Sequence, residues 1–171
     1  MISKIRDLNF NDLLEPCKSG NHIGLLSDSG CPGIADPGSD VVLSAHLRNI
    51  EIKPIIGPSS IIMAMMSSGL NGQSFSFNGY LPIKEKQLID KIKFYESKSK
   101  KENQTQIFIE TPYRNNKLLS KLIETLNPKS MLCVASNINL QNQSIITKKV
   151  FLWKKTKIDI NKQPTIFIFN Y

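Results

Sequence analysis

A loop rich in glycine, proline, serine and aspartate occupies residues 24–38 of the sequence. Glycine lets a backbone approach a ligand closely, and short serine and aspartate side chains can bond to ligand hydroxyls and amines. In a parallel α/β sheet, such a loop follows the carboxyl end of a strand, where small-molecule clefts form. The loop is therefore the first candidate for a ligand site. A simpler interpretation is a turn in which Asp36 or Ser39 caps the next helix.

Two charged side chains form a second candidate. Glu110 ends an apolar strand pattern, and Arg114 lies where a helical pattern begins. A carboxylate and a guanidinium at such a junction can bind each other or touch a ligand. The alternative interpretation is a structural ion pair that locks the strand to the helix.

The histidines and cysteines of the sequence give little support to a metal site or a reactive thiol. His22 and His46 are the only histidines, and with Cys17 and Cys31 their spacings match no paired zinc-ligand pattern. No base is placed beside Cys31 by sequence, so a small buried or half-buried thiol is expected there rather than a nucleophile. We expect no metal site.

The first 72 residues supply the elements around the first loop. A polar lead precedes a short amphipathic helix that begins near Phe10. Two apolar segments are then expected to form buried strands, each followed by a turn rich in glycine, proline and serine and by a helix. These strands are residues 23–26 and 52–56, and the helices start at Ser39 and Ile61. Two strands do not make a stable sheet against helices, so part of this sheet is expected to be missing.

The remaining 99 residues alternate strand and helix patterns. The expected strands are residues 75–80, 106–110, 131–136, 145–153 and 165–169, and the expected helices are residues 84–97 and 115–126. A polar, lysine-rich stretch at residues 97–104 is expected to be a surface loop, with a loop that faces RNA as an equal alternative. A small break at residues 67–73 and a change of charge mark the expected domain boundary, with domains at residues 1–72 and 73–171.

The charge of the chain is uneven. The formal net charge is +8 and the isoelectric point is about 9.4. Residues 1–72 carry five basic and seven acidic residues, whereas residues 73–171 carry seventeen and seven. A basic half indicates a polyanionic partner such as RNA. The alternative is a lysine-rich composition in which most of these side chains are only solvated.

Three widely spaced cysteines, with no signal peptide ahead of them, are typical of a reducing cytoplasm. No apolar run reaches the roughly 20 residues needed to span a bilayer. We therefore expect a soluble cytoplasmic protein with no membrane partner.

Four motifs, taken in order, resemble those of the tetrapyrrole methylase superfamily. They occupy residues 27–38, 57–60, 79–82 and 110–114, and they span nearly the whole chain. The resemblance is strongest to the ribosomal RNA small subunit methyltransferase I branch, which methylates a ribose 2′-hydroxyl of small-subunit rRNA. Family members begin with a strand, a proline- and glycine-rich loop and several further elements, so the resemblance implies an N-terminally shortened chain.

The resemblance implies a two-lobed α/β fold, with an incomplete first lobe and a second lobe made of a mixed sheet with helices. It also implies that S-adenosyl-L-methionine lies in the cleft between the lobes. Two turns rich in glycine and serine beside each other would present many backbone donors, which suits the zwitterionic tail of this cofactor. The cofactor-binding residues implied are Ser27, Asp28, Ser29, Gly30, Asp36, Pro37, Gly57, Pro58, Ser59, Ser60, Asn137 and Pro164.

The expected function is S-adenosylmethionine-dependent methyl transfer, with the 2′-hydroxyl of an rRNA ribose as acceptor. No catalytic base is assigned, since Asp28, Asp36 and Glu110 are candidates by position alone. One alternative is a methylase of tetrapyrroles or other small molecules. Another is an inactive remnant that binds RNA or a partner chain. Expected partners are rRNA and either a second copy of the chain or a complementing N-terminal lobe.

Overall fold

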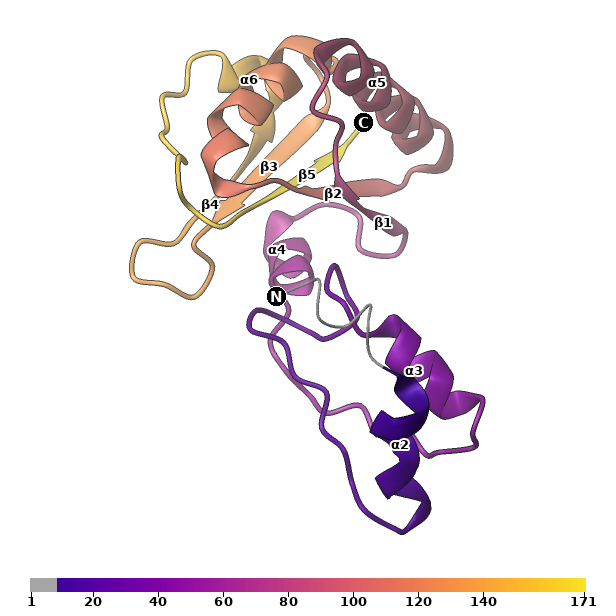
Figure 1. The fold of residues 1–171 in the computed structure, drawn as a ribbon. Helices are drawn as coiled ribbons and strands as arrows, with labels where there is room; N and C mark the ends of the chain where they lie inside the picture. The colour runs from indigo at the N-terminus through magenta and orange to yellow at the C-terminus, as the bar shows by residue number, and fades with distance from the viewer. Residues whose placement is uncertain (1–8) are drawn as a thin grey trace. The chain divides into compact units, whose positions relative to one another are not determined.

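The computed structural model describes residues 9–171 (Figure 1). The chain forms two compact units, one ending at Ser59 and the other running from Ser60 to Tyr171. The polar lead expected before Phe10 lies outside the described residues except for Asn9. The lobe boundary expected at residues 72 and 73 stays a prediction, and the compact units divide thirteen residues earlier.

The second unit is built on a five-stranded mixed sheet with the strand order β1-β2-β5-β3-β4. Its strands are β1 (Phe75–Tyr80), β2 (Thr105–Ile109), β3 (Met131–Ser136), β4 (Ser144–Lys149) and β5 (Thr165–Asn170). Strands β1 and β2 are parallel, and the other neighbouring pairs are antiparallel. The mixed sheet expected for the second lobe is thus confirmed, and its central strand is the last one in the chain.

Helices cover both faces of this sheet (Figure 1). On one face lie α5 (Glu85–Glu102), α6 (Asn115–Thr125) and the short α7 (Val150–Trp153), and on the other lies α4 (Ser60–Ser68). A 3-10 turn, η1 (Pro112–Arg114), joins β2 to α6. The helical pattern explains this arrangement, because the apolar side chains of each helix recur on the side that meets the sheet.

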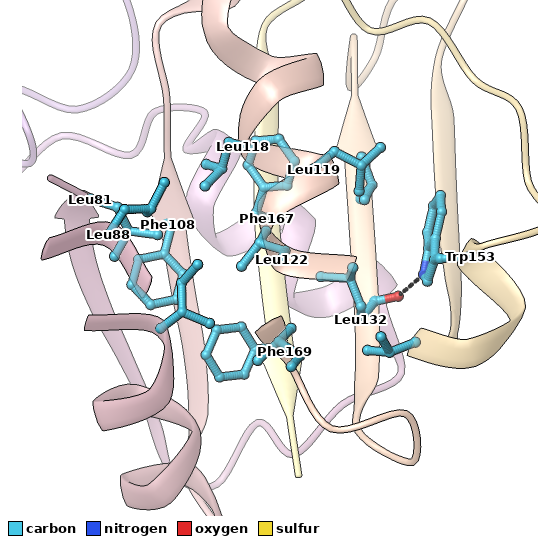
Figure 2. Packing of buried hydrophobic residues seen from close by; sticks show 14 of the residues in the cluster. Leu81, Leu88, Phe108, Leu118, Leu119, Leu122, Leu132, Trp153, Phe167 and Phe169 are labelled. Atoms are coloured by element: carbon cyan, nitrogen blue, oxygen red, sulfur yellow. Dashed lines mark hydrogen bonds between the residues drawn. The ribbon is translucent and has the colours of Figure 1, made fainter. Parts of the chain in front are cut away.

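The larger core lies between the sheet and the helices α5, α6 and α7 (Figure 2). Phe108 of β2 and Phe169 of β5 stack with ring centroids 5.5 Å apart, and both are fully buried. Leu122 of α6 packs against them. Trp153 of α7 donates a hydrogen bond from Nε1 to the carbonyl oxygen of Leu132, at 2.9 Å. The core therefore anchors the last helix to the middle of the sheet.

Two expected boundaries in this unit are wrong. Helix α5 continues through the lysine-rich stretch, which was expected to be a loop, and ends where Asn103 takes a left-handed conformation with φ of 47°. Residues 145–153 form a strand only to Lys149, because Lys149 pairs with Met131, the first residue of β3. Beyond that pair the described residues offer no further strand partner, and the chain turns into α7. No helix among residues 9–171 is long and apolar enough to cross a membrane.

The first unit contains α2 (Phe10–Lys18) and α3 (Ser39–His46). The strands expected at residues 23–26 and 52–56 are wrong, since within the described part of this unit neither segment pairs with another strand. Leu26 and Ile55 are about nine-tenths exposed, at 89% and 92%. A strand requires a hydrogen-bonded neighbour, so the apolar pattern alone could not produce one here.

Candidate functional site

The loop at residues 27–38 folds on itself before α3 begins. The backbone N–H of Ser29 donates to Oγ of Ser27 at 3.1 Å, which closes a short serine turn. Gly30 has φ of 81°, and a Cβ at this position would meet no atom of residues 9–171 within 4 Å. Asp28 is exposed and Asp36 is half-buried. The loop thus presents backbone groups and carboxylates on an open surface.

The end of the loop is fixed by Gly38. Its φ is 135°, and a Cβ at this position would lie 2.8 Å from Cδ2 of Leu25. Gly38 is also the N-cap of α3, and no side chain makes a cap hydrogen bond there. The expectation that Asp36 or Ser39 caps this helix is therefore wrong.

The loop and the turn that ends the first unit contact each other. The thiol of Cys31 donates to the carbonyl oxygen of Pro58, with 3.6 Å between sulfur and oxygen. This contact joins two expected cofactor segments, residues 27–37 and 57–59, which are separated by about twenty residues in the sequence. The half-buried thiol of Cys31 thereby has a structural role.

In the second unit, a backbone hydrogen bond joins Asn137 to Pro164. The backbone N–H of Asn137 donates to the carbonyl oxygen of Pro164 at 2.9 Å. The side chain of Asn137 donates to Oε1 of Gln163 at 3.0 Å, and φ of Asn137 is 51°. These bonds hold the end of β3 against the start of β5, so two expected cofactor residues lie at one end of the sheet.

Ser60 is the first residue of α4, which packs on the sheet beside this end. Asn139 donates from Nδ2 to Sδ of Met63 at 3.1 Å, and this contact places the first turn of α4 next to the turn after β3. Of the twelve residues expected to bind the cofactor, nine lie in the first unit and three, including Ser60, lie in the second. Their joint role stays a prediction.

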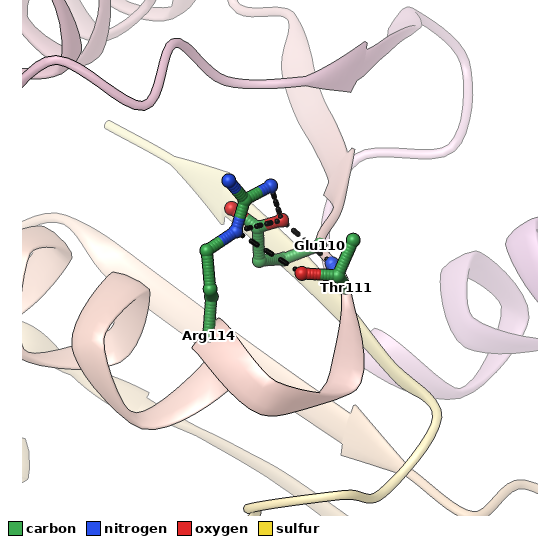
Figure 3. Close-up of polar contacts among 3 residues, drawn as sticks. All are labelled: Glu110, Thr111 and Arg114. Atoms are coloured by element: carbon green, nitrogen blue, oxygen red, sulfur yellow. Dashed lines mark hydrogen bonds and ion pairs between the residues drawn. The ribbon is translucent and has the colours of Figure 1, made fainter.

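Glu110 and Arg114 form an ion pair (Figure 3). Oε1 of Glu110 accepts from Nη2 of Arg114 at 2.5 Å, from Nε at 3.1 Å and from the backbone N–H of Thr111 at 2.6 Å. The Glu110 side chain is only 7% exposed. The pair links the end of β2 to the turn before α6, which favours the structural interpretation over a ligand contact.

Asn115 is a positioning residue that sequence reasoning missed. It is fully buried at the start of α6, and its Nδ2 donates to the carbonyl oxygens of Gln163, at 2.6 Å, and Ile160, at 3.3 Å. Its Oδ1 has no hydrogen-bond partner among the described residues. Asn115 therefore holds the segment that carries Pro164. An asparagine at a helix start reads as an ordinary polar residue, so no local signal could have revealed this role.

No group of three or more histidine, cysteine, aspartate or glutamate side chains among residues 9–171 is arranged to hold a metal ion. His22 and His46 are exposed. Cys133 is buried in β3, and burial raises the pKa of its thiol, although a hydrogen bond with Thr147 opposes this effect. A protonated, buried thiol of this kind is unreactive.

Known proteins resemble this chain in fold and in sequence. No protein-family model matches it. In fold, it matches the methyltransferase CobJ with a TM-score of 0.61 at 15% identity, over 95% of this chain and 71% of that one. A uroporphyrin-III-C-methyltransferase from Thermus thermophilus matches with a TM-score of 0.50 at 14% identity, over 82% of this chain and 60% of that one. The fold is therefore that of the tetrapyrrole methylases.

In sequence, the chain is 33% identical over 133 residues to ribosomal RNA small subunit methyltransferase I of Vibrio cholerae, covering 78% of this chain and 45% of the relative. It is 34% identical over 159 residues to the protein of the same name from Buchnera aphidicola of Schizaphis graminum, covering 91% of this chain and 54% of the relative. The chain is thus a homologue of the ribosomal RNA small subunit methyltransferase I proteins, and it spans about half of their length.

Proposed function

We propose that this chain is part or all of an S-adenosylmethionine-dependent methyltransferase that methylates a ribose 2′-hydroxyl of small-subunit rRNA. The observation that carries this proposal is the identity of 33–34% to proteins of that name, over most of this chain. The tetrapyrrole methylase fold supports it, and an rRNA substrate would place the protein in the cytoplasm.

The chemistry of the residues suits the cofactor. The loop of the first unit offers open backbone around Gly30 and the carboxylates of Asp28 and Asp36, which can meet an ammonium or ribose hydroxyls. In the second unit, Asn137 and Pro164 present the backbone at a strand end. We propose that these residues, together with Ser27, Ser29, Pro37, Gly57, Pro58, Ser59 and Ser60, hold S-adenosylmethionine.

When bound, S-adenosylmethionine supplies a methyl group on a sulfonium, and transfer of this group is an in-line displacement. The protein then has to align the donor with the acceptor hydroxyl and exclude water. Removal of the hydroxyl proton requires a base. Glu110 is already engaged by Arg114 and Thr111. Asp28 and Asp36 therefore remain the carboxylates to test.

The exposed apolar segments of the first unit favour the presence of a partner chain that covers them. Residues 23–26 and 52–56 carry the pattern of buried strands, yet Leu26, Ile55 and Ile56 are exposed. Isolated strands are unstable in water, and their unpaired edges favour pairing with another chain. We propose that a second copy of the chain or a complementing lobe covers these segments. Light scattering of the purified chain, alone and mixed with the portion of a relative that this chain does not match, distinguishes the two.

Neither alternative function has a specific observation in its favour. Methylation of a tetrapyrrole rests on fold similarity at 15% identity, which carries no substrate information. An inactive remnant is consistent with the exposed segments. However, the hydrogen bond between Cys31 and Pro58 joins the loop at residues 27–38 to the turn at residues 57–60, so these two glycine-containing segments lie together.

Calorimetric titration of S-adenosylmethionine tests the proposal. We expect saturable binding by the chain, lost in Asp28→Ala and kept in the control Asp90→Ala, which removes an exposed aspartate of α5 outside the expected site. Transfer of a labelled methyl group to small-subunit rRNA tests the acceptor. If the folded chain binds no cofactor, alone or with a complementing lobe, the proposal is wrong.

A further inference from the structure

The C-terminal part of the second unit concentrates positive charge. Between Leu126 and Tyr171 the chain carries seven lysines and one aspartate. Six of these lysines lie in three segments that the structure brings together, and we call this group the basic corner. The basic corner consists of Lys129, Lys148, Lys149, Lys154, Lys155 and Lys157.

Backbone hydrogen bonds assemble the basic corner. The N–H of Val150 donates to the carbonyl oxygen of Ser130 at 2.9 Å. The N–H of Phe151 donates to the carbonyl oxygen of Pro128 at 3.1 Å. These bonds place the start of α7 beside the turn that carries Lys129. The corner is therefore a fixed part of the fold and not a mobile tail.

Trp153 connects the corner to the core. Its indole is 1% exposed and binds the carbonyl oxygen of Leu132, as described above. Nζ of Lys148 lies 4.9 Å from the centre of the Trp153 ring and donates to Oγ1 of Thr156 at 2.9 Å. The ring and the hydroxyl thus hold the Lys148 ammonium in place without neutralising it.

No carboxylate in the described part of the chain forms an ion pair with a lysine of the corner. Glu96 reaches the neighbouring turn, but Oε1 accepts from the N–H of Asn127 at 2.7 Å and from Oγ of Ser130 at 2.6 Å. Asp159 accepts from Nδ2 of Asn116 at 2.7 Å. The positive charge is therefore open to an external anion.

Exposed apolar side chains lie among these charges. Phe151 is 46% exposed and Leu152 is 43% exposed, and both belong to α7 between Lys149 and Lys154. Proteins bind single-stranded nucleic acid through basic side chains on phosphates and aromatic rings on bases. The basic corner offers both kinds of group on one small surface.

We propose that the basic corner binds the phosphate backbone of an RNA strand, with a base stacked on Phe151. This inference rests on the proposed function, because it gives the rRNA substrate a docking surface. Lys149 pairs with Met131 and Ser144 pairs with Ser136, so the corner lies at the opposite end of β3 from Asn137. A six-residue strand spans about 20 Å. The corner therefore anchors RNA at the end of the sheet opposite to Asn137 and Pro164, which are expected cofactor residues of the second unit.

Edge protection is the alternative explanation of the lysines on β4. Strand β4 is an edge of the sheet, and lysines on an edge discourage pairing with another chain. This explanation accounts for Lys148 and Lys149. It does not account for Lys129, Lys154 and Lys155, which lie outside the strand.

The test compares two charge-matched variants. The first is the quadruple variant Lys149→Gln, Lys154→Gln, Lys155→Gln and Lys157→Gln. The control is Lys84→Gln, Lys86→Gln, Lys93→Gln and Lys101→Gln, which removes four exposed lysines from α5 or its N-cap. Fluorescence anisotropy with a labelled 20-nucleotide single-stranded RNA gives the dissociation constant at several salt concentrations.

We expect the first variant to bind this RNA at least about tenfold more weakly than the control at 0.1 M salt. The slope of log affinity against log salt should be shallower by about 3 for this variant. Each phosphate contact on a single strand contributes about 0.7 to that slope, and the variant removes four lysines. Phe151→Ala should weaken binding about tenfold while leaving the salt dependence unchanged, because stacking releases no counterions.

Three results would overturn the inference. The two quadruple variants could lose affinity equally, which would indicate diffuse charge. The first variant could self-associate while its RNA affinity is unchanged, which would indicate edge protection. The corner could bind anionic lipid vesicles more strongly than RNA. Titration of the same variants with S-adenosylmethionine separates this inference from the proposed function. Neither variant changes an expected cofactor residue, so both should bind the cofactor as the parent chain does.

Discussion

At the scale of single residues, Asn115 has the clearest energetic role. Its buried Nδ2 binds two carbonyl oxygens, of Ile160 and Gln163. The substitution Asn115→Asp keeps the shape, but it replaces the donor with an oxygen that faces those carbonyls. We expect the free energy of unfolding to fall by about 2–4 kcal/mol, because buried acceptors are left without a donor. Urea unfolding measures this, with the exposed Asn142→Asp as a control that should change stability little.

The lowered pKa of Asp159 predicts that the stability of the protein depends on pH. Hydrogen bonds from the side chain of Asn116 and the backbone N–H of Asn161 hold the pKa of Asp159 below its ordinary value. A lowered pKa in the folded state stabilises the protein above the pKa of the unfolded state, and this stability is lost as pH falls through the folded pKa. We expect Asp159→Asn to be less stable than the parent protein at pH 7 and equal to it at the acid end. A difference that persists at low pH would contradict this account.

At the scale of elements, α7 shows how a four-residue helix is kept in place. Such a helix is too short to be stable alone, so tertiary contacts must hold it. Trp153 supplies them by its burial and its hydrogen bond to Leu132. We expect Trp153→Phe to lower the free energy of unfolding by about 1–3 kcal/mol, since it removes this bond and part of the packed ring.

The exposed neighbour of Trp153 provides the control. Phe151→Leu changes a side chain that is 46% exposed, and we expect it to alter stability by less than about 0.5 kcal/mol. Denaturant unfolding of both variants measures the difference. Equal stability of the two variants would mean that the indole does not anchor α7.

At the scale of the whole molecule, the two units differ in how much apolar surface they bury. Within residues 9–59, only Leu14 and Ala45 are buried hydrophobic residues, whereas the second unit has two apolar clusters around its sheet. Burial of apolar surface is the main source of stability. We therefore expect the first unit to open at lower denaturant concentration than the second.

Two cysteines report on the units separately. Cys31 is half-buried in the first unit, and Cys133 is fully buried in the second with a raised pKa. In a Cys17→Ser background, thiol labelling at pH 7 followed by peptide mass spectrometry should modify Cys31 at least about a hundredfold faster than Cys133. Simultaneous labelling of both as urea rises would show that the units unfold together.

The sequence by itself determined the elements whose pattern is local. The apolar spacing of α6 and the strand patterns of β2, β3 and β5 predicted those elements within a few residues, because helix and strand periodicities follow from backbone geometry. The motifs at residues 27–38, 57–60, 79–82 and 110–114 predicted the fold and the homology that the comparisons confirm. The cofactor residues they imply stay a prediction.

The tertiary structure alone decided what depends on partners distant in sequence. It inserted β5 between β2 and β3, ended β4 at Lys149 and left residues 23–26 and 52–56 without a strand partner. It also assembled the basic corner from three separate segments. The physical reason is common to all of these. A strand or an assembled charged surface exists only when a second segment lies within reach, and the sequence near one segment does not specify where the other will be.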